Sequence, residues 1–316
     1  MTAGSIEAAR LALRPMMLQL AQRLSQSSKE ACRLFDGRDD SAPEWAQIAI
    51  DYYHPVLLVS LEAPLAPPVL EALLDGLEQT CALFGAETIV CQSCHLAGKP
   101  VQVMRGALPS QPIATEDGLK YGIVLATGLP LGFALEWAEA RRWLATVSAG
   151  KRVLNLYADT CVFSVVARAS GATHAVNLEP SAAALRQGQQ NHQLNGVGDG
   201  VSYLSHNVFK SWGRLRRSGP FDVIIVSPPN NNPGSFLAER DYPRVISKLP
   251  SLCAPGAEVL LCLDSPQVAA RFLLDAVAQQ APQLLFIKDL RPAVAFDERD
   301  HDPALKLMCF TYSDSM

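Results

Sequence analysis

The sequence predicts an α/β fold, in which a doubly wound, mainly parallel sheet with an antiparallel last strand is preceded by a small α/β domain. In the second half, short apolar runs alternate with helical stretches, which is typical of βαβ units. The last two strand-like runs, 284–290 and 305–312, have no helical stretch between them, and such a connection reverses the final strand. The 316 residues, with 49% hydrophobic and 18% charged side chains, suffice for two domains.

Three segments are expected. Residues 1–40 form a helical segment, residues 41–130 a small α/β domain suited to substrate recognition, and residues 131–316 the doubly wound domain. The first segment is amphipathic and contains Pro15, so it predicts a surface helix kinked at that proline, with a transit peptide as the alternative.

The elements follow from hydrophobic periodicity and from glycine and proline positions. In the small domain we expect a polar turn at 33–40, a hairpin at 119–126, a helix at 67–84, and strands at 48–53, 56–61, 87–91 and 101–104. In the larger domain we expect strands at 152–156, 175–178, 201–204, 221–226 and 258–263, and helices at 163–170, 181–195, 242–252 and 266–281.

Composition and local sequence patterns limit the cell compartment and the haem or metal sites that we expect. No apolar run reaches the roughly 18 residues of a membrane span, and the start of the chain lacks a secretory pattern, so we expect a soluble, cytoplasmic protein without membrane contact. The eight cysteines are scattered, which is typical of reduced, buried thiols. Residues 91–95 match C-x-x-C-H, the haem-attachment pattern, but no second ligand pair completes a zinc site. We interpret the match as coincidental and expect no metal.

Polar residues follow the carboxyl ends of the expected strands, where ligands bind in open α/β sheets. The first group, Asn155 to Cys161, leads directly into a helix, and backbone N–H groups at such a turn can meet an anionic ligand group. Glu179 closes the second strand and could accept hydrogen bonds from two ribose hydroxyls. A structural role for a strand-end glutamate is the alternative.

The third and fourth strand ends complete the series. Asn207 could meet an adenine edge, or it could satisfy its own loop backbone. The run Phe221–Val226 predicts a buried strand that stops at Ser227-Pro228-Pro229-Asn230, because proline cannot donate to a sheet ladder. The order and spacing of the four groups predict one ligand cleft.

A basic cluster lies beside this predicted cleft. We expect RNA contact through four residues, or a solvated helix face as the alternative: Lys210, Arg214, Arg216 and Arg217. The net charge of −4 argues mildly against tight binding to bare duplex, although it allows a structured RNA. The sequence leaves the oligomeric state and any protein partner open.

These motifs resemble the class I S-adenosylmethionine-dependent methyltransferases, and within them the bacterial 23S ribosomal RNA base methyltransferases and their relatives. The resemblance covers most of the chain, through Arg152–Ser164, Ala175–Ser181, Asn191–Gly196, Asn207–Leu215, Gly219–Pro229, Arg33–Arg38, Asp51–Leu58, Gly132-Phe133 with Glu136, and Leu305–Phe310.

The resemblance implies a Rossmann-like fold, S-adenosyl-L-methionine as cofactor and RNA, with 23S ribosomal RNA as one candidate, as substrate. By carry-over, residues 155–160 line the methionine part of the cofactor, Glu179 the ribose and Asn207 the adenine. Ser227 to Asn230 border the acceptor, and Phe133 and Glu136 lie near the same cleft. The implied cofactor-binding residues are Asn155, Tyr157, Ala158, Asp159, Thr160, Glu179, Asn207, Phe133 and Glu136, and the implied catalytic residues are Ser227, Pro228, Pro229 and Asn230.

Several residues depart from the family pattern. The family usually has Tyr at the position of Asp159 and Gly at the position of Val162. It usually has Asp at the positions of both Asn207 and Ser227. Members that methylate cytosine C5 carry a cysteine at the position of Ser265, and Cys262 is offset from it by three residues, so a nitrogen acceptor is favoured.

Two alternatives follow from these observations. The departures suggest a catalytically impaired protein of this fold that acts as a cofactor- or RNA-binding module. A nicotinamide dehydrogenase is the other alternative, but no G-x-G-x-x-G follows the first strand of the larger domain.

Overall fold

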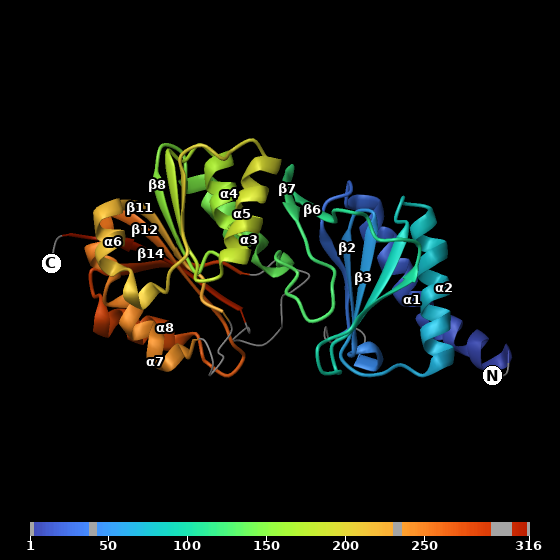
Figure 1. Ribbon diagram of the computed structural model, residues 1–316. Helices are drawn as coiled ribbons and strands as arrows, with labels where there is room; N and C mark the ends of the chain where they lie inside the picture. The colour runs from blue at the N-terminus through green and yellow to red at the C-terminus, as the bar shows by residue number, and fades with distance from the viewer. Residues whose placement is uncertain (1–2, 38–42, 230–235, 292–304, 315–316) are drawn as a thin grey trace. The chain divides into compact units, whose positions relative to one another are not determined.

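The computed structural model describes residues 3–37, 43–229, 236–291 and 305–314. The chain divides into two compact units, Met1–Leu135 and Glu136–Met316. Figure 1 shows both, coloured along the chain. None of the helices within the described ranges is long and apolar enough to cross a membrane.

The first unit contains a five-stranded sheet in the order β1-β2-β3-β4-β5. Only the β3–β4 pair is parallel, and helix α2 joins these two strands. The elements of this unit are α1 (Ala3–Gln26), β1 (Cys32–Asp36), η1 (Pro43–Trp45), β2 (Ile48–Tyr53), β3 (Val56–Leu61), α2 (Pro67–Ala82), β4 (Thr88–Ser93), β5 (Val101–Arg105), β6 (Ile113–Glu116) and β7 (Leu119–Gly122).

Helices α1 and α2 pack side by side and share one core with the sheet (Figure 1). From α1, side chains spaced three and four residues apart face that core, including Leu13, Leu20 and Leu24. Each fully buried side chain of this kind contributes roughly 1.5–3 kcal/mol. Pro15 lies inside α1. The hairpin β6–β7 turns at Asp117-Gly118, both with positive φ, as a type I′ turn requires.

Strand β1 corrects the expectation of a polar turn at 33–40. Arg33 lies within the strand, donates through Nε to Asp51 Oδ1 (2.6 Å) and through Nη1 to Asp36 Oδ2 (2.6 Å). All three side chains are about nine-tenths buried. The two carboxylates neutralise the guanidinium, so charged residues occupy a strand; removing one partner of such a buried pair costs about 3–5 kcal/mol.

The second unit contains a seven-stranded sheet in the order β10-β9-β8-β11-β12-β14-β13. Strand β14 pairs antiparallel with both of its neighbours, and the other neighbouring pairs are parallel. Its elements are η2 (Leu135–Trp137), α3 (Ala138–Val147), β8 (Arg152–Leu156), α4 (Val162–Ala169), β9 (His174–Leu178), α5 (Ala182–Leu194), β10 (Val201–Leu204), η3 (Val208–Lys210), α6 (Trp212–Ser218), β11 (Phe221–Val226), α7 (Ala238–Ile246), η4 (Leu249–Ser251), β12 (Cys253–Asp264), α8 (Arg271–Gln280), β13 (Leu284–Asp289) and β14 (Leu305–Tyr312).

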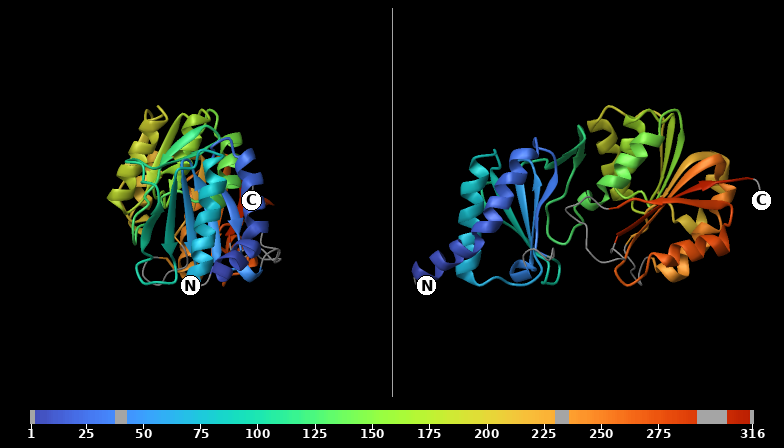
Figure 2. Two further views of the ribbon diagram at one scale, coloured as in Figure 1. Left: turned by 90° about the vertical axis from the view of Figure 1, so that its right-hand side faces the viewer. Right: turned by 180° about the vertical axis from the view of Figure 1, so that it is seen from behind.

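Helices cover both faces of this sheet, which Figure 1 and the view from behind in Figure 2 show. Alternate residues of each central strand therefore enter different cores. Leu154 and Ile224 pack with side chains of α6, α7 and α8, whereas Val153 and Val223 pack with side chains of α3 and α4. Because both faces of these strands are buried, their sequences are continuous apolar runs.

Several element boundaries differ from the sequence expectation, and the expected hairpin at 119–126 is formed instead by β6 and β7 at 113–122. Strand β12 begins at Cys253 rather than at 258, because Phe221 pairs with Cys253 ahead of an irregularity in the ladder. Helix α7 begins at Ala238 rather than at 242, since the buried Asp241 carboxylate accepts the Leu237 N–H (3.0 Å) at its start. Helix α8 spans 271–280 rather than 266–281.

Candidate functional site

The turn after β8 has an unusual backbone. Tyr157, Asp159 and Cys161 have positive φ (60°, 45° and 61°), whereas Ala158 and Thr160 between them do not. Three N–H groups of the turn are already engaged: Ala158 donates to the Leu178 carbonyl oxygen (3.1 Å), Asp159 to Glu179 Oε2 (3.2 Å) and Cys161 to the Ala158 carbonyl oxygen (2.7 Å). Helix α4 begins directly afterwards, and no side-chain hydrogen bond caps it at Cys161. The first N–H groups of this helix can therefore meet an anionic ligand group.

Residues of helix α5 pack against this turn and support it. Asn191, fully buried, donates through Nδ2 to the Thr160 carbonyl oxygen (2.9 Å). Gly188 leaves room for Cys161, because a Cβ at position 188 would lie 2.4 Å from the Cys161 Sγ. His192 donates through Nδ1 to the Gly188 carbonyl oxygen (2.7 Å). The sequence showed these residues only within a helix and gave no sign of their contacts.

Glu179 lies at the end of β9 and binds the same turn. Its Oε2 accepts the Asp159 N–H (3.2 Å), and its Oε1 accepts the Ser181 N–H (2.9 Å). Burial raises the pKa of this carboxyl, an effect that the two N–H groups oppose. The side chain is half-buried, so the remaining lone pairs of its oxygens can meet ligand hydroxyls.

Asn155 does not line the turn with its side chain. It is completely buried within β8 and donates through Nδ2 to Asn177 Oδ1 on β9 (3.0 Å). Asn155 Oδ1 and Asn177 Nδ2 have no hydrogen-bond partner among the residues that the structure describes. The pair links two strands beneath the turn rather than presenting a group to solvent.

Ser227 brings the end of β11 to the same turn. Its hydroxyl lies 3.3 Å from the Leu156 carbonyl oxygen and 3.4 Å from that of Tyr157, and it donates its single proton to this pair of acceptors. The lone pairs of Oγ remain able to accept. Pro228 is buried and Pro229 exposed, whereas Asn230 lies outside the described residues.

Helix α7 and the residue Phe236 before it pack near the turn. The Tyr157 ring meets Phe236 edge to face (centroids 5.5 Å apart), and Phe236 in turn meets Tyr242 of α7 (5.3 Å). Asp241 is buried and ion-paired with Arg240 and Arg244, and hydrogen bonds led by that from Arg240 lower its pKa. Arg244 also lies over the Phe209 ring at 4.1 Å, which joins α7 to the loop after β10.

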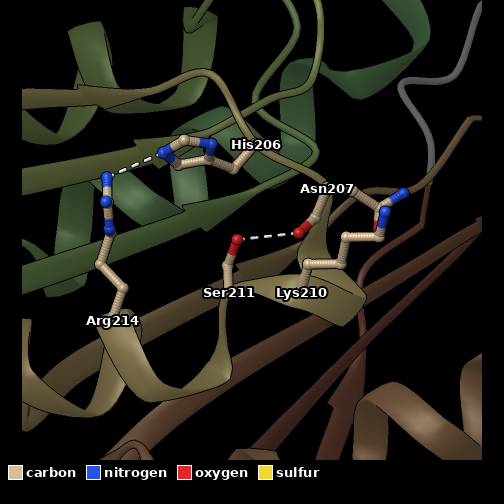
Figure 3. A pocket seen from close by; sticks show the side chains of 5 residues that line it. All are labelled: His206, Asn207, Lys210, Ser211 and Arg214. Carbon is tan, nitrogen blue, oxygen red and sulfur yellow. Dashed lines mark hydrogen bonds between the residues drawn. The ribbon is translucent and has the colours of Figure 1, made fainter.

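In that loop Asn207 caps a short helix. Its Oδ1 accepts the Phe209 N–H (2.9 Å) at the start of η3, so only Nδ2 is left to reach a ligand. The basic residues Lys210, Arg214, Arg216 and Arg217 are all exposed. A pocket opens between the loop and α6 (Figure 3), lined by His206, Asn207, Lys210, Ser211 and Arg214.

Phe133 and Glu136 fall in different units. Phe133 is buried in the first unit and stacks on Tyr121 (centroids 4.9 Å apart). Glu136 is half-buried in η2, at the beginning of the second unit. The structure brings together residues 157–160, Glu179 and Ser227 of the expected site.

Cys262 and Cys91 lie in cores, whereas Cys94 is half-buried in the turn after β4. Cys262 is fully buried in β12, and burial raises the pKa of its thiol far above the ordinary value. Ser265, at the position expected for a nucleophilic cysteine, is also buried, three residues further along the chain. Cys91 packs in the core of the first unit. No cluster of three or more metal-ligating side chains occurs among the described residues.

The sequence profile of one family, described as S-adenosylmethionine-dependent methyltransferase, matches residues 32–311. The chain belongs to this family. The family and the cofactor class expected from the sequence are thereby confirmed, and the Rossmann-like fold class agrees with a solved relative. That structure, a protein assigned as a methyltransferase and complexed with SAH, has a TM-score of 0.83 and 19% identity, covering 97% of this chain and 81% of its own.

Curated relatives are similar over much of the chain. "Ribosomal RNA large subunit methyltransferase I" of Aeromonas salmonicida is 28% identical over 72% of this chain and 59% of its own length. The protein of that name from Shewanella denitrificans is 29% identical over 85% of this chain and 68% of its own. The match thus spans about three-fifths of the first relative.

Proposed function

We propose that this protein transfers a methyl group from S-adenosylmethionine to a base of ribosomal RNA, with a nitrogen acceptor favoured. The observation that supports this most is the convergence of turn 157–161, Glu179 and Ser227 at the carboxyl ends of β8, β9 and β11. The names of the curated relatives support ribosomal RNA as the substrate. A ribosomal substrate would place the protein in the cytoplasm.

The residues fit such a cofactor. N–H groups at the start of helix α4 would hold the methionine carboxylate, and Glu179 would accept bonds from the ribose hydroxyls. Asn207 Nδ2 would meet the adenine edge. The cofactor supplies an electrophilic methyl on sulfur. With the cofactor bound, the acceptor nitrogen would form the new carbon–nitrogen bond as the carbon–sulfur bond broke, and its surplus proton would pass to solvent.

In this proposal Ser227 contacts the acceptor base. With its proton engaged by main-chain carbonyls, Oγ can accept a hydrogen bond from an amino group and orient its lone pair. A carbon acceptor that needs a cysteine nucleophile is disfavoured, because Cys262 is buried and its thiolate strongly destabilised. Pro228 and Pro229, which follow Ser227 directly, would border the acceptor.

The RNA would be bound by the exposed cations of the loop after β10 and of α6: Lys210, Arg214, Arg216 and Arg217. The small α/β domain of residues 41–130 would contribute to substrate recognition. A second candidate, a cofactor- or RNA-binding module without transfer, is favoured by Asp159, Asn207 and Ser227, which replace the usual family residues.

Tritiated methyl transfer to ribosomal RNA from a strain that lacks the gene tests the enzyme. We expect label in large-subunit RNA from that strain and none in RNA already modified in the parent. Calorimetry with the cofactor separates the alternatives: binding without labelling supports the binding module, and no binding at millimolar cofactor contradicts both the enzyme and a cofactor-binding role.

A further inference from the structure

Asp159 lies between the groups that would bind the two ends of the cofactor's charged portion. Its N–H donates to Glu179 Oε2 (3.2 Å), the carboxylate assigned to the ribose. Helix α4, whose first N–H groups would meet the methionine carboxylate, begins shortly afterwards at Val162. In S-adenosylmethionine the sulfonium and the α-ammonium lie between ribose and carboxylate, and both are positively charged. The part of the cofactor that passes Asp159 is therefore its cationic part.

Asp159 adds a second negative charge beside that of Glu179. Neither carboxylate has a basic side chain as ion-pair partner among the residues that the structure describes. Although Asp159 exposes part of its surface, the surrounding turn removes water from its carboxyl and raises the pKa of that group, an effect that a hydrogen bond from the Thr160 N–H opposes. Burial raises the pKa of Glu179, and the charge of Asp159 raises it further. A positive ligand group would relieve this repulsion.

The backbone at position 159 explains the size of the residue and leaves its charge unexplained. Its φ is 45°, in the left-handed region that Gly, Asn and Asp tolerate best. Asn would meet this requirement as well as Asp does. The negative charge of Asp159 is thus a separate property, and the change Asp159→Asn can remove it without a change of backbone.

Methyl transfer changes the charge of the group that lies nearest to the ribose. The sulfonium of S-adenosylmethionine becomes the neutral thioether of S-adenosylhomocysteine, whereas the ribose, adenine, ammonium and carboxylate stay the same. One methylene joins the sulfur to the ribose ring, and Asp159 is hydrogen-bonded directly to the glutamate assigned to that ribose. A carboxylate at this place stabilises the sulfonium more than the thioether.

We propose that Asp159 makes the site selective for the sulfonium cofactor over its thioether product. The inference rests on the cofactor site of the proposed function and names a residue that sets its specificity. Asp159 makes and breaks no bond in the transfer. Its charge favours binding of the reactant and departure of the product, so that S-adenosylhomocysteine inhibits the protein less.

The test is calorimetry of the full chain with S-adenosylmethionine and with S-adenosylhomocysteine, at low and at high salt. We expect Asp159→Asn to weaken binding of S-adenosylmethionine about fivefold and that of S-adenosylhomocysteine less than about twofold. Salt screens exposed charges, so high salt should reduce the preference of the wild type and leave the variant nearly unaffected. Equal losses for both compounds would place Asp159 at the α-ammonium, which both share, and would overturn the inference.

Asp199→Asn is the matched control. It removes the same charge from an exposed residue just before β10, at the edge of the sheet opposite the strand ends that form the site. Its ratio of the two affinities should equal that of the wild type. A ratio that falls as far as in Asp159→Asn would mean that the net charge of the protein, rather than Asp159, favours the cation, and would also overturn the inference.

Two further results separate the inference from the proposed function. A wild type that binds neither compound overturns the cofactor site and the inference together. A wild type that binds both compounds with a ratio that neither salt nor Asp159→Asn changes overturns the inference alone, while labelling of ribosomal RNA still decides the proposed function. The salt series uses the wild type only, so it tests the inference even if the variant is unstable.

Discussion

The turn after β8 and the loop after β10 lie at the same edge of one sheet, but they are built in opposite ways. Turn 157–161 is braced by Glu179, Asn191 and Ser227, and most of these contacts involve its backbone. In loop 205–211, by contrast, His206, Asn207 and Lys210 are exposed. The first region is ordered before any ligand binds, whereas the second offers side chains that a ligand can order.

The difference matches the two ligands that we propose. A small cofactor of fixed shape gains affinity from a preorganised cradle, because little entropy is lost on binding. A flexible RNA backbone needs charged groups that can adjust, since phosphate contacts position the strand without demanding one geometry. Substitutions that disturb the support of the turn should therefore have larger effects than substitutions that disturb the attachment of the loop.

Gly188→Ala should disturb the turn most. The new Cβ would lie 2.4 Å from the Cys161 Sγ, and overpacking of this kind costs about 1–3 kcal/mol. If the strain falls on the turn, cofactor affinity in calorimetry drops by up to about 100-fold. The second change Cys161→Gly removes the clash and suits the positive φ at 161, so it should restore binding. Failure of this rescue would contradict the contact.

Glu179→Ala should weaken cofactor binding by about tenfold or more, because charge-assisted bonds to the ribose hydroxyls and to the Asp159 N–H are lost. Unchanged affinity in the same calorimetric measurement would misplace the ribose site. Glu179→Gln, which keeps the shape without the charge, is the matched control for the pH dependence.

The raised pKa of Glu179 also gives a direction with pH. Wild-type affinity should fall as the pH is lowered through that pKa, beginning above the ordinary glutamate value of about 4.3, and Glu179→Gln should be weaker and nearly flat. In the free protein the sign is reversed: the stability from protonated Glu179 is present at low pH and is lost as the pH rises through the raised pKa. A flat wild-type affinity profile would contradict the assignment.

Ser227→Ala should leave cofactor affinity intact and lower the rate of methyl transfer. The loss of one neutral hydrogen bond to the acceptor corresponds to about 2- to 13-fold in single-turnover rate. Ser247→Ala is the control, because it removes an exposed hydroxyl directly after the end of α7. Equal rates for Ser227→Ala and the wild type would argue that Ser227 only joins β11 to the turn.

Arg244→Gln should have the smallest effect. The stack on Phe209 is worth about 0.5–1 kcal/mol at an exposed site, so RNA affinity should fall by about five-fold at most. Arg240→Gln removes another ion pair to Asp241 without touching the ring and should leave RNA affinity unchanged. Equal RNA affinities of Arg244→Gln and Arg240→Gln, measured by fluorescence anisotropy, would show that the contact with Phe209 does not hold the loop in place.

The fold could be predicted where local pattern and final environment agree. The strand expected at 221–226 is β11 itself, since its apolar run is buried on both faces. Strand β1 was missed because Arg33 and Asp36 look like turn residues, and Asp51, the second carboxylate that pairs with Arg33, is contributed by another strand. No local pattern reports such a pairing.

The site shows the same limit. Ser227 and Glu179 were found because they stand at strand ends, where ligand groups gather. The inward direction of Asn155 depends on Asn177 of the neighbouring strand, and the role of Gly188 depends on a sulfur 27 positions earlier in the chain. The first contact exists only once β8 and β9 have paired, and the second only once α5 has packed, so residue type and spacing could not reveal them.

The position of β14 between β12 and β13 has a consequence for synthesis. During translation β12 and β13 emerge first, and each lacks its β14 partner until residues 305–312 leave the ribosome. In the finished protein Leu285, Phe286 and Ile287 of the edge strand are still about half exposed. A nascent chain therefore presents an open, apolar sheet edge, and completion of this sheet has to wait until residues 305–312 have been made.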